Sequence, residues 1–155
     1  MAVKRIIIEG PDNAGKSTLA KKLSDILGWE IQHSGGPCNS MDDVIERMDR
    51  VKSSHKTIWD RVPCISEQIY GPILRHVPYS ARTTCGMMGY PFADYVIIYC
   101  RPTIGILLNF QTHQVKSTDG EEHLKGIQSH AHDIIRAYDE EMIHYPYLLY
   151  DWSPS

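Results

Sequence analysis

Residues 10–17 have types and spacing that suit the binding of a phosphate chain. They read Gly-Pro-Asp-Asn-Ala-Gly-Lys-Ser and fit the pattern Gly-x-x-x-x-Gly-Lys-Ser/Thr at every fixed position. Glycines allow the backbone to curl around a diphosphate with its N–H groups turned inward, and a helix starting near Lys16 adds the positive end of its dipole. The Lys16 ammonium would meet the β- and γ-phosphates, and the Ser17 hydroxyl would be a ligand of Mg²⁺. The motif predicts a site for a nucleoside triphosphate, ATP, with Mg²⁺. The residues expected to form it are Gly10, Asn13, Ala14, Gly15, Lys16, Ser17 and Thr18.

Asp60 and Arg61 form a second group that could do chemistry, directly after the apolar stretch 57–59. A guanidinium has a fixed fork of donors that matches phosphate oxygens. The neighbouring carboxylate could act as a base only toward a neutral hydroxyl, because a nucleoside monophosphate arrives already ionised. A local ion pair that ends a strand is the structural alternative. The phosphate-binding motif upstream favours the functional interpretation.

Apolar patterns predict the strands that would carry these groups, at residues 4–9, 30–33, 57–59, 95–100 and 147–150. Helical patterns lie between them, so the chain is expected to form one α/β domain over residues 1–155, with a largely parallel five-stranded sheet flanked by helices. Parallel sheets bind ligands beyond the carboxyl ends of their strands. Gly10, Asp60 and Arg101 each follow a predicted strand, and they should therefore converge on one edge of the sheet.

The helices are predicted from 3–4 spacing of apolar residues and from their end signals. They comprise residues 16–27 with a stop at Gly28, a segment capped by Ser40, residues 66–74, a short segment opened by Pro102, and one long helix whose apolar positions run from Leu124 to Met142. Gly71-Pro72 should distort or end the helix at 66–74. Ile26 on the first helix and Ile45 on the second are expected on the apolar faces.

The composition argues against several classes of protein. With 42% hydrophobic and 23% charged residues the chain is an ordinary globular sequence, and its net charge of −3 disfavours a polynucleotide substrate. No apolar run approaches the roughly 20 residues of a membrane span. The four cysteines lack the short spacings of zinc or redox motifs. We expect a cytoplasmic protein that acts on a small molecule, with no nucleic acid or membrane partner and with a homodimer left open.

The stretch 9–18, Glu-Gly-Pro-Asp-Asn-Ala-Gly-Lys-Ser-Thr, resembles the P-loop of thymidylate kinases. The stretch 58–61, Ile-Trp-Asp-Arg, followed by Ser-Glu-Gln-Ile-Tyr-Gly at 66–71, resembles the Asp-Arg segment of the same family and the Glu-Arg-Ser segment of deoxynucleoside kinases. The short chain and His-Ser-Gly-Gly-Pro at 33–37 are similar to compact bacteriophage members of this group. The resemblance implies a three-layer P-loop kinase fold.

The resemblance also implies roles. Asp12 would contact the sugar 3′-hydroxyl of the acceptor, Arg61 would neutralise phosphoryl charge, and Asp60 would lie near the reacting oxygen or the water shell of the metal. The implied catalytic residues are Lys16, Asp60, Arg61 and Lys116, and the implied acceptor-binding residues are Asp12, Arg61, Glu67, Tyr70 and Arg75.

Residues 111–120 correspond to the lid of this family, which usually carries arginines. Here the segment has only Lys116, helped by His113 and Gln114, so Arg75 and Arg101 either compensate or are surface arginines. Residues 151–153 follow the last strand, where the family places the loop beside the donor adenine. Trp152 itself is expected to pack against that strand.

Three functions are compatible with these patterns. The leading one is a nucleoside monophosphate kinase that makes a deoxynucleoside diphosphate, with thymidylate or a related, possibly modified, nucleotide as acceptor. A deoxynucleoside 5′-kinase that uses Asp60 as base is the first alternative; the family's nucleoside kinases carry glutamate at this place, which favours the monophosphate. A non-catalytic nucleotide-dependent switch is the second, and the absence of a guanine-reading Asn-Lys-x-Asp motif counts against it.

Replacing Lys16 by alanine should impair phosphoryl transfer. The variant loses charge-assisted contacts worth about 1.5–3 kcal/mol, which is on the order of 10–100-fold in rate or more. The measurement is the rate of phosphate transfer from ATP with magnesium. Full activity of Lys16→Ala would contradict the interpretation of the motif.

Overall fold

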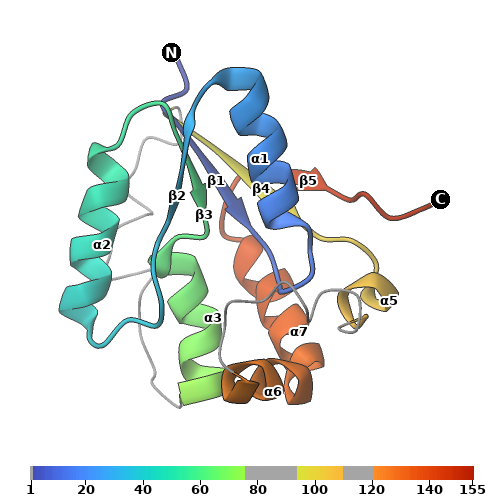
Figure 1. The fold of residues 1–155 in the computed structure, drawn as a ribbon. Coiled ribbons are helices and arrows are strands. Elements are labelled where there is room, and N and C mark those ends of the chain that lie inside the picture. Colours follow the sequence, from blue (N-terminus) through green and yellow to red (C-terminus); the bar gives the residue numbers. More distant parts are fainter. Residues whose placement is uncertain (1, 76–93, 110–120) are drawn as a thin grey trace.

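Five parallel strands form a single sheet in the computed structural model, which describes residues 2–75, 94–109 and 121–155, the last range without the side chains of 121–124. Their order across the sheet is β2-β3-β1-β4-β5 (Figure 1). The strands are β1 Arg5–Glu9, β2 Glu30–His33, β3 Thr57–Asp60, β4 Tyr95–Cys100 and β5 Leu148–Tyr150. The predicted strands thus exist, with ends that differ by one residue or less.

Helices cover both faces of the sheet. Alternate residues of β1 point to opposite sides, so Ile6 and Ile8 pack with α1, whereas Ile7 packs with α2, α3 and α7. The helices are α1 Lys16–Leu27, α2 Met41–Ser53, α3 Pro63–Arg75, α5 Ile104–Leu107, α6 Glu121–Ser129 and α7 Ala131–Met142. The three-layer α/β fold predicted from the sequence is confirmed. None of the described helices has the length and apolar character needed to cross a membrane.

The carboxyl end of β1 delivers the phosphate-binding loop, because β1 is the central strand and is buried along its whole length. Gly10 follows it with φ +153°, and a Cβ atom at this position would lie 2.4 Å from the carbonyl oxygen of Cys100 at the end of β4. Only glycine fits there without displacing backbone. The close approach of Gly10 to Cys100 therefore fixes the direction in which the loop leaves the sheet.

Glu9 is a fully buried carboxylate that ties the end of β1 to two helices. It accepts hydrogen bonds from the Val62 N–H (2.9 Å), the Tyr138 hydroxyl (2.9 Å) and the Ser66 hydroxyl (3.4 Å). Burial raises the pKa of Glu9, and the nearby Arg61 charge and the hydrogen bonds from Val62 and Tyr138 oppose that shift. The carboxylate fixes the turn that carries Arg61, because Val62 is the next residue.

Two helices differ from the sequence-based prediction. α3 begins at Pro63, three residues early, and continues through Pro72 to Arg75. Pro63 loses nothing in the first turn, and packing of α3 against α2 and α7 offsets the hydrogen bond that Pro72 cannot make. The long C-terminal helix is two helices, interrupted at His130. The apolar spacing continues across the break, with Ile127 and Ile134 both buried, so the spacing could not reveal it.

Three smaller predictions, for Pro102, Ile26 and Ile45, also differ from the structure. Pro102 does not open the short helix; α5 begins at Ile104 and Thr103 is its N-cap residue. Ile26 is 77% exposed and Ile45 is 37% exposed, so neither belongs to the core. The caps at Gly28 and Ser40 are confirmed.

Removing the Tyr138 hydroxyl should destabilise the protein. Tyr138→Phe keeps the ring but withdraws a donor from the buried Glu9 carboxylate, which should lower the free energy of unfolding by about 1.5–3 kcal/mol. The measurement is urea denaturation. Tyr147→Phe is the matched control, since Tyr147 is 40% exposed, and it should change stability by less than about 0.5 kcal/mol. Equal effects of the two substitutions would contradict the role of Glu9.

Candidate active site

The phosphate-binding loop between β1 and α1 has the backbone that its sequence predicts. Asn13 and Gly15 adopt left-handed conformations with φ of 67° and 86°. Gly15 is the N-cap residue of α1 and offers no side chain to the first N–H groups of the helix. These groups, left without a capping side chain, and the helix dipole are suited to hold phosphate oxygens. The Asn13 side chain donates to the carbonyl of Leu107 at 3.2 Å, which anchors the loop to α5.

Lys16 is the first residue of α1, directly after the loop, and is buried. Its Nζ donates to the carbonyl oxygen of Pro11 at 2.6 Å, so the side chain folds back over the loop. Burial, followed by the charge of Arg61, lowers the pKa of Lys16 to about 8. An anion bound in the loop would oppose both effects.

Ser17 and Asp60 lie together at the ends of α1 and β3. The Ser17 hydroxyl donates to Asp60 Oδ2 at 3.2 Å. A hydroxyl and a carboxylate are oxygen ligands of the kind that Mg²⁺ prefers, and the pair therefore fits the ion that the motif implies. His33, at the end of β2, is the next neighbour, with Nδ1 3.7 Å from Asp60 Oδ2.

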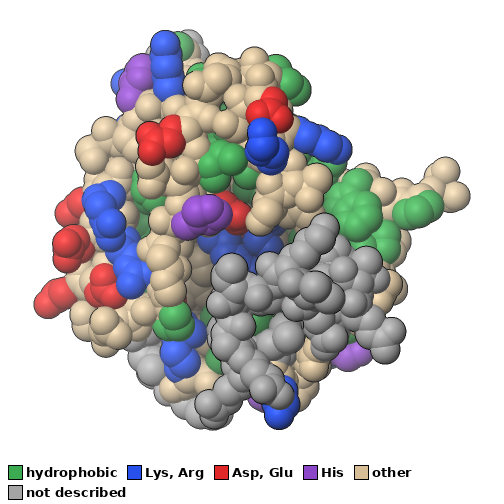
Figure 2. All heavy atoms as spheres, in the orientation of Figure 1, with side chains coloured by type: hydrophobic (Ala, Val, Ile, Leu, Met, Phe, Trp, Pro, Cys, Tyr) green, Lys and Arg blue, Asp and Glu red, His purple; other side chains and the backbone are tan. Residues whose placement is uncertain are grey.

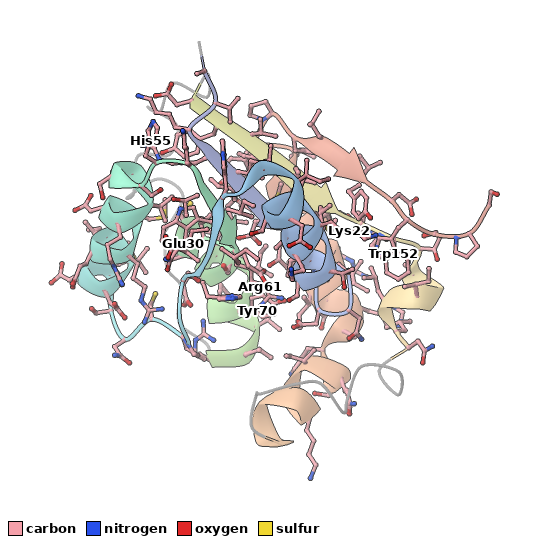
Figure 3. All side chains as sticks on the ribbon, turned by 45° about the horizontal axis from the view of Figure 1, so that its top comes forward. Lys22, Glu30, His55, Arg61, Tyr70 and Trp152 are labelled. Carbon is pink, nitrogen blue, oxygen red and sulfur yellow. The ribbon has the colours of Figure 1, made fainter. Side chains whose placement is uncertain are left out.

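Arg61 connects the phosphate-binding loop with α3. Its Nη2 donates to Asp12 Oδ1 (3.2 Å) and to the Tyr70 hydroxyl (2.8 Å), and the hydroxyl in turn donates to Asp12 Oδ2 (2.7 Å). The guanidinium lies 4.8 Å from the centre of the Tyr70 ring. Burial would raise the pKa of Asp12, but the charges of Arg61 and Lys16 outweigh it and hold that pKa below its usual value. Figure 3 shows Arg61 and Tyr70 side by side where β3 gives way to α3.

A cavity, open on one side, begins at this cluster and extends between the segment 34–38 and α3. Arg61 and Tyr70 line the end near the phosphate-binding loop, and Glu67 and Arg75 line it further along α3. Figure 2 shows lysine and arginine side chains at the bottom of a hollow in the middle of one face, beside acidic and histidine side chains.

The structure brings most of the predicted residues together. The residues 10–18 form the loop, Asp60 and Arg61 face it, and Glu67, Tyr70 and Arg75 line the cavity. Arg101 binds Asp139 on α7 through two hydrogen bonds of 2.9 and 3.0 Å, and of the two alternatives left open for it this contact favours the arginine outside the phosphate site. Lys116, His113, Gln114 and the predicted lid 111–120 lie outside the described residues.

Two residues at the site, Trp152 and Arg47, have contacts that the sequence did not predict. Trp152 does not pack against β5 as expected; its Nε1 donates to the carbonyl of Ala14 at 2.7 Å, over the phosphate-binding loop. Only its place in the family, beside the donor, hinted at this. Arg47 binds Asp43 with Nε and Nη2 (both 3.0 Å), and with Nη1 it binds the carbonyls of Ser34 and Gly36 at the rim of the cavity. The i, i+4 spacing of Asp43 and Arg47 predicts the ion pair but not the carbonyl contacts.

Known proteins are similar to this chain in fold. No family model matches the sequence, and no curated protein matches it. Among solved structures, YorR of Bacillus subtilis in complex with phosphorylated GDP is 23% identical, with a TM-score of 0.73 over 96% of this chain and 85% of that chain. Deoxyadenosine kinase of M. mycoides with bound dATP is 18% identical, with a TM-score of 0.59 over 96% and 90% of the two chains. Thymidylate kinase of Candida albicans is 15% identical, with a TM-score of 0.58 over 97% and 84%.

The chain has the P-loop kinase fold. At these identities the similarity carries no further information on substrate. The chemistry of the site is therefore inferred from the residues of the site itself.

Nucleotide binding should be coupled to proton uptake at Lys16. With a pKa of about 8, Lys16 is about half charged at pH 8, and a bound triphosphate stabilises the charged form. We expect uptake of about half a proton at pH 8, and affinity that falls as the pH rises above 8. The measurement is titration calorimetry in two buffers of different ionisation enthalpy. Lys16→Arg is the control, because arginine stays charged and should abolish the uptake. Binding of the wild-type protein without proton uptake would contradict the lowered pKa.

Proposed function

We propose that this protein is an ATP-dependent kinase that transfers the γ-phosphoryl group to a nucleoside monophosphate and forms the diphosphate. One observation carries the proposal: Arg61 is bonded to Asp12 in the phosphate-binding loop and at the same time lines the adjacent cavity. A cation that borders both places can neutralise charge between a donor and an acceptor. The fold similarity to a deoxyadenosine kinase and a thymidylate kinase supports the assignment.

The donor side uses the N-terminus of α1. Backbone N–H groups of residues 13–18 and the Lys16 ammonium would hold the phosphates of ATP, and Ser17, with Asp60 acting through water, would hold Mg²⁺. Mg²⁺ held by these residues would neutralise charge on the phosphates. The Lys16 ammonium uses one of its three donors on the carbonyl of Pro11, which leaves two for phosphate oxygens.

The acceptor side needs positioning more than proton removal. An ionised phosphate oxygen of the acceptor forms the new P–O bond while the bond from the γ-phosphorus to ADP breaks, so no proton has to leave the attacking atom. Arg61 stabilises the added negative charge through its fork of donors. Asp12, which the sequence resemblance assigns to the sugar hydroxyl, is held in place by Arg61 and Tyr70.

A deoxynucleoside 5′-kinase is the alternative, with Asp60 as the base. The contact between Asp60 and the Ser17 hydroxyl favours the monophosphate, because it engages the carboxylate with the metal-binding position. A non-catalytic nucleotide-dependent switch would need no acceptor cavity. Thymidylate is the acceptor that the sequence resemblance suggests.

Other features of the proposal come from the sequence. We propose that residues 1–155 act as one catalytic domain in the cytoplasm, without nucleic acid or membrane partners. Lys116 and the segment 111–120 would form the lid, which lies outside the described residues. Each of these statements remains a prediction.

Substitutions at Asp60 and Arg61 separate the two acceptor classes. With a monophosphate acceptor, Arg61→Ala should lower kcat/KM on the order of 10–100-fold or more. Asp60→Asn should cost less than the 10²–10⁴-fold typical of a lost general base. The measurement is product analysis over a panel of deoxynucleosides and their monophosphates with ATP and magnesium. Arg50→Ala, an exposed arginine of α2, is the control and should have wild-type activity. Phosphorylation of free nucleosides with the monophosphates inert would sink the proposal.

A further inference from the structure

The cavity contains an ion pair, Glu67–Arg75, that takes no part in the proposed phosphoryl transfer. Glu67 Oε2 accepts a hydrogen bond from Arg75 Nη2 at 2.6 Å, and Oε1 accepts one from the Cys38 N–H at 3.2 Å. The Glu67 side chain is 7% exposed and that of Arg75 is 24% exposed. Both residues line the cavity. A carboxylate that is so little exposed is costly unless polar partners surround it.

The three arginines of the cavity differ in how fully they are engaged. Arg47 binds Asp43 and two carbonyls, and Arg61 binds Asp12 and Tyr70. Among the residues that the structure describes, Arg75 has one hydrogen-bond partner, Glu67, and its Nε atom, like that of Arg61, is buried without a hydrogen bond. Glu67 uses one lone pair on each oxygen in the bonds described above, so each oxygen can accept once more. Glu67 therefore still offers two acceptor positions to a ligand, and the guanidinium of Arg75, whose side chain is partly exposed, has further N–H donors.

The pair also lines the same cavity as Arg61. Glu67 lies three residues before Tyr70, which bonds Arg61, so the two side chains share one face of α3. An acceptor with its phosphate at Arg61 and its base in the cavity would therefore meet Glu67 and Arg75.

We propose that this pair reads the base of the acceptor and that the base is guanine. This inference rests on the proposed function, because it assigns the acceptor of the same site. Guanine presents two adjacent donors, N1–H and the 2-amino group, which match the two oxygens of Glu67. It also presents O6 and N7, which match the donors of Arg75.

The other bases fit less well. Thymine has a single N3–H between two carbonyl oxygens, which a carboxylate repels. Cytosine offers Glu67 one amino donor, and its remaining edge atoms are acceptors. Adenine has an amino donor but no carbonyl oxygen for the guanidinium. The anionic Glu67 thus disfavours the thymidylate that the sequence resemblance suggests.

The test compares dGMP with dIMP, which lacks only the 2-amino group, and with dTMP, on the wild-type protein. We expect dGMP to be the best acceptor and kcat/KM for dIMP to be lower by about 10- to 100-fold. In Glu67→Gln the ratio of dGMP to dIMP should fall toward one, because the amide keeps one acceptor and turns a donor toward the base. Glu46→Gln, on the exposed side of α2, should keep the wild-type ratio. A preference for dTMP, or equal rates for dGMP and dIMP in the wild-type protein, would overturn the inference.

Binding separates this inference from the proposed function. Titration calorimetry of dGMP and dIMP needs no phosphoryl transfer and no variant. Tighter binding of dGMP by a protein that phosphorylates nothing would support the role of Glu67 and overturn the kinase. Phosphorylation of monophosphates with no preference between dGMP and dIMP in rate or affinity would do the reverse.

Discussion

The organisation of this protein depends on one guanidinium. Arg61 stands at the end of β3 in a left-handed conformation, with φ +70°, and binds Asp12 from the phosphate-binding loop and Tyr70 from α3. A non-glycine residue adopts this conformation only when its surroundings fix it. The surroundings are visible: Arg61 N–H donates to the carbonyl of Ile8, and the Glu9 carboxylate accepts from the N–H of Val62. The central strand therefore sets the direction of Arg61, and Arg61 joins the loop to the cavity.

This arrangement concentrates charge before any ligand is present. Lys16 and Arg61 lie close enough for the charge of Arg61 to lower the pKa of Lys16, and Asp12 and Glu9 lie among them. Preorganised cations of this kind cost stability in the free protein and gain when an anion binds between them. The electrostatics thus suit a site for phosphates on both sides of Arg61. The acceptor cavity continues from there along α3 to Glu67 and Arg75.

The sequence was sufficient where a function depends on local backbone. The loop at 10–17 needs glycines at fixed places, and the strands 5–9 and 95–100 are apolar runs in the interior of the sheet, so each could be recognised alone. Contacts between residues that are distant in the sequence could not be recognised in this way. Arg101 and Arg61 both follow strands, yet Arg101 meets Asp139 across the fold, which no spacing encodes. Trp152 reaches Ala14 because β5 is parallel to β4 and ends at the same edge as the loop. The pairing of Glu67 with Arg75 depends on α3 continuing past Pro72, against the local preference of proline.

The Arg61–Asp12 interaction holds the phosphate-binding loop against α3. A double-mutant cycle measures it directly, with the free energy of unfolding determined for the wild-type protein, Asp12→Ala, Arg61→Ala and the double variant. Residues that share a network are coupled by about 0.5–3 kcal/mol. We expect a coupling in the upper half of this range, since each single variant leaves one charge without its partner in a largely buried cluster. Losses that add to within about 0.3–0.5 kcal/mol would show that the two residues act independently and would contradict the account.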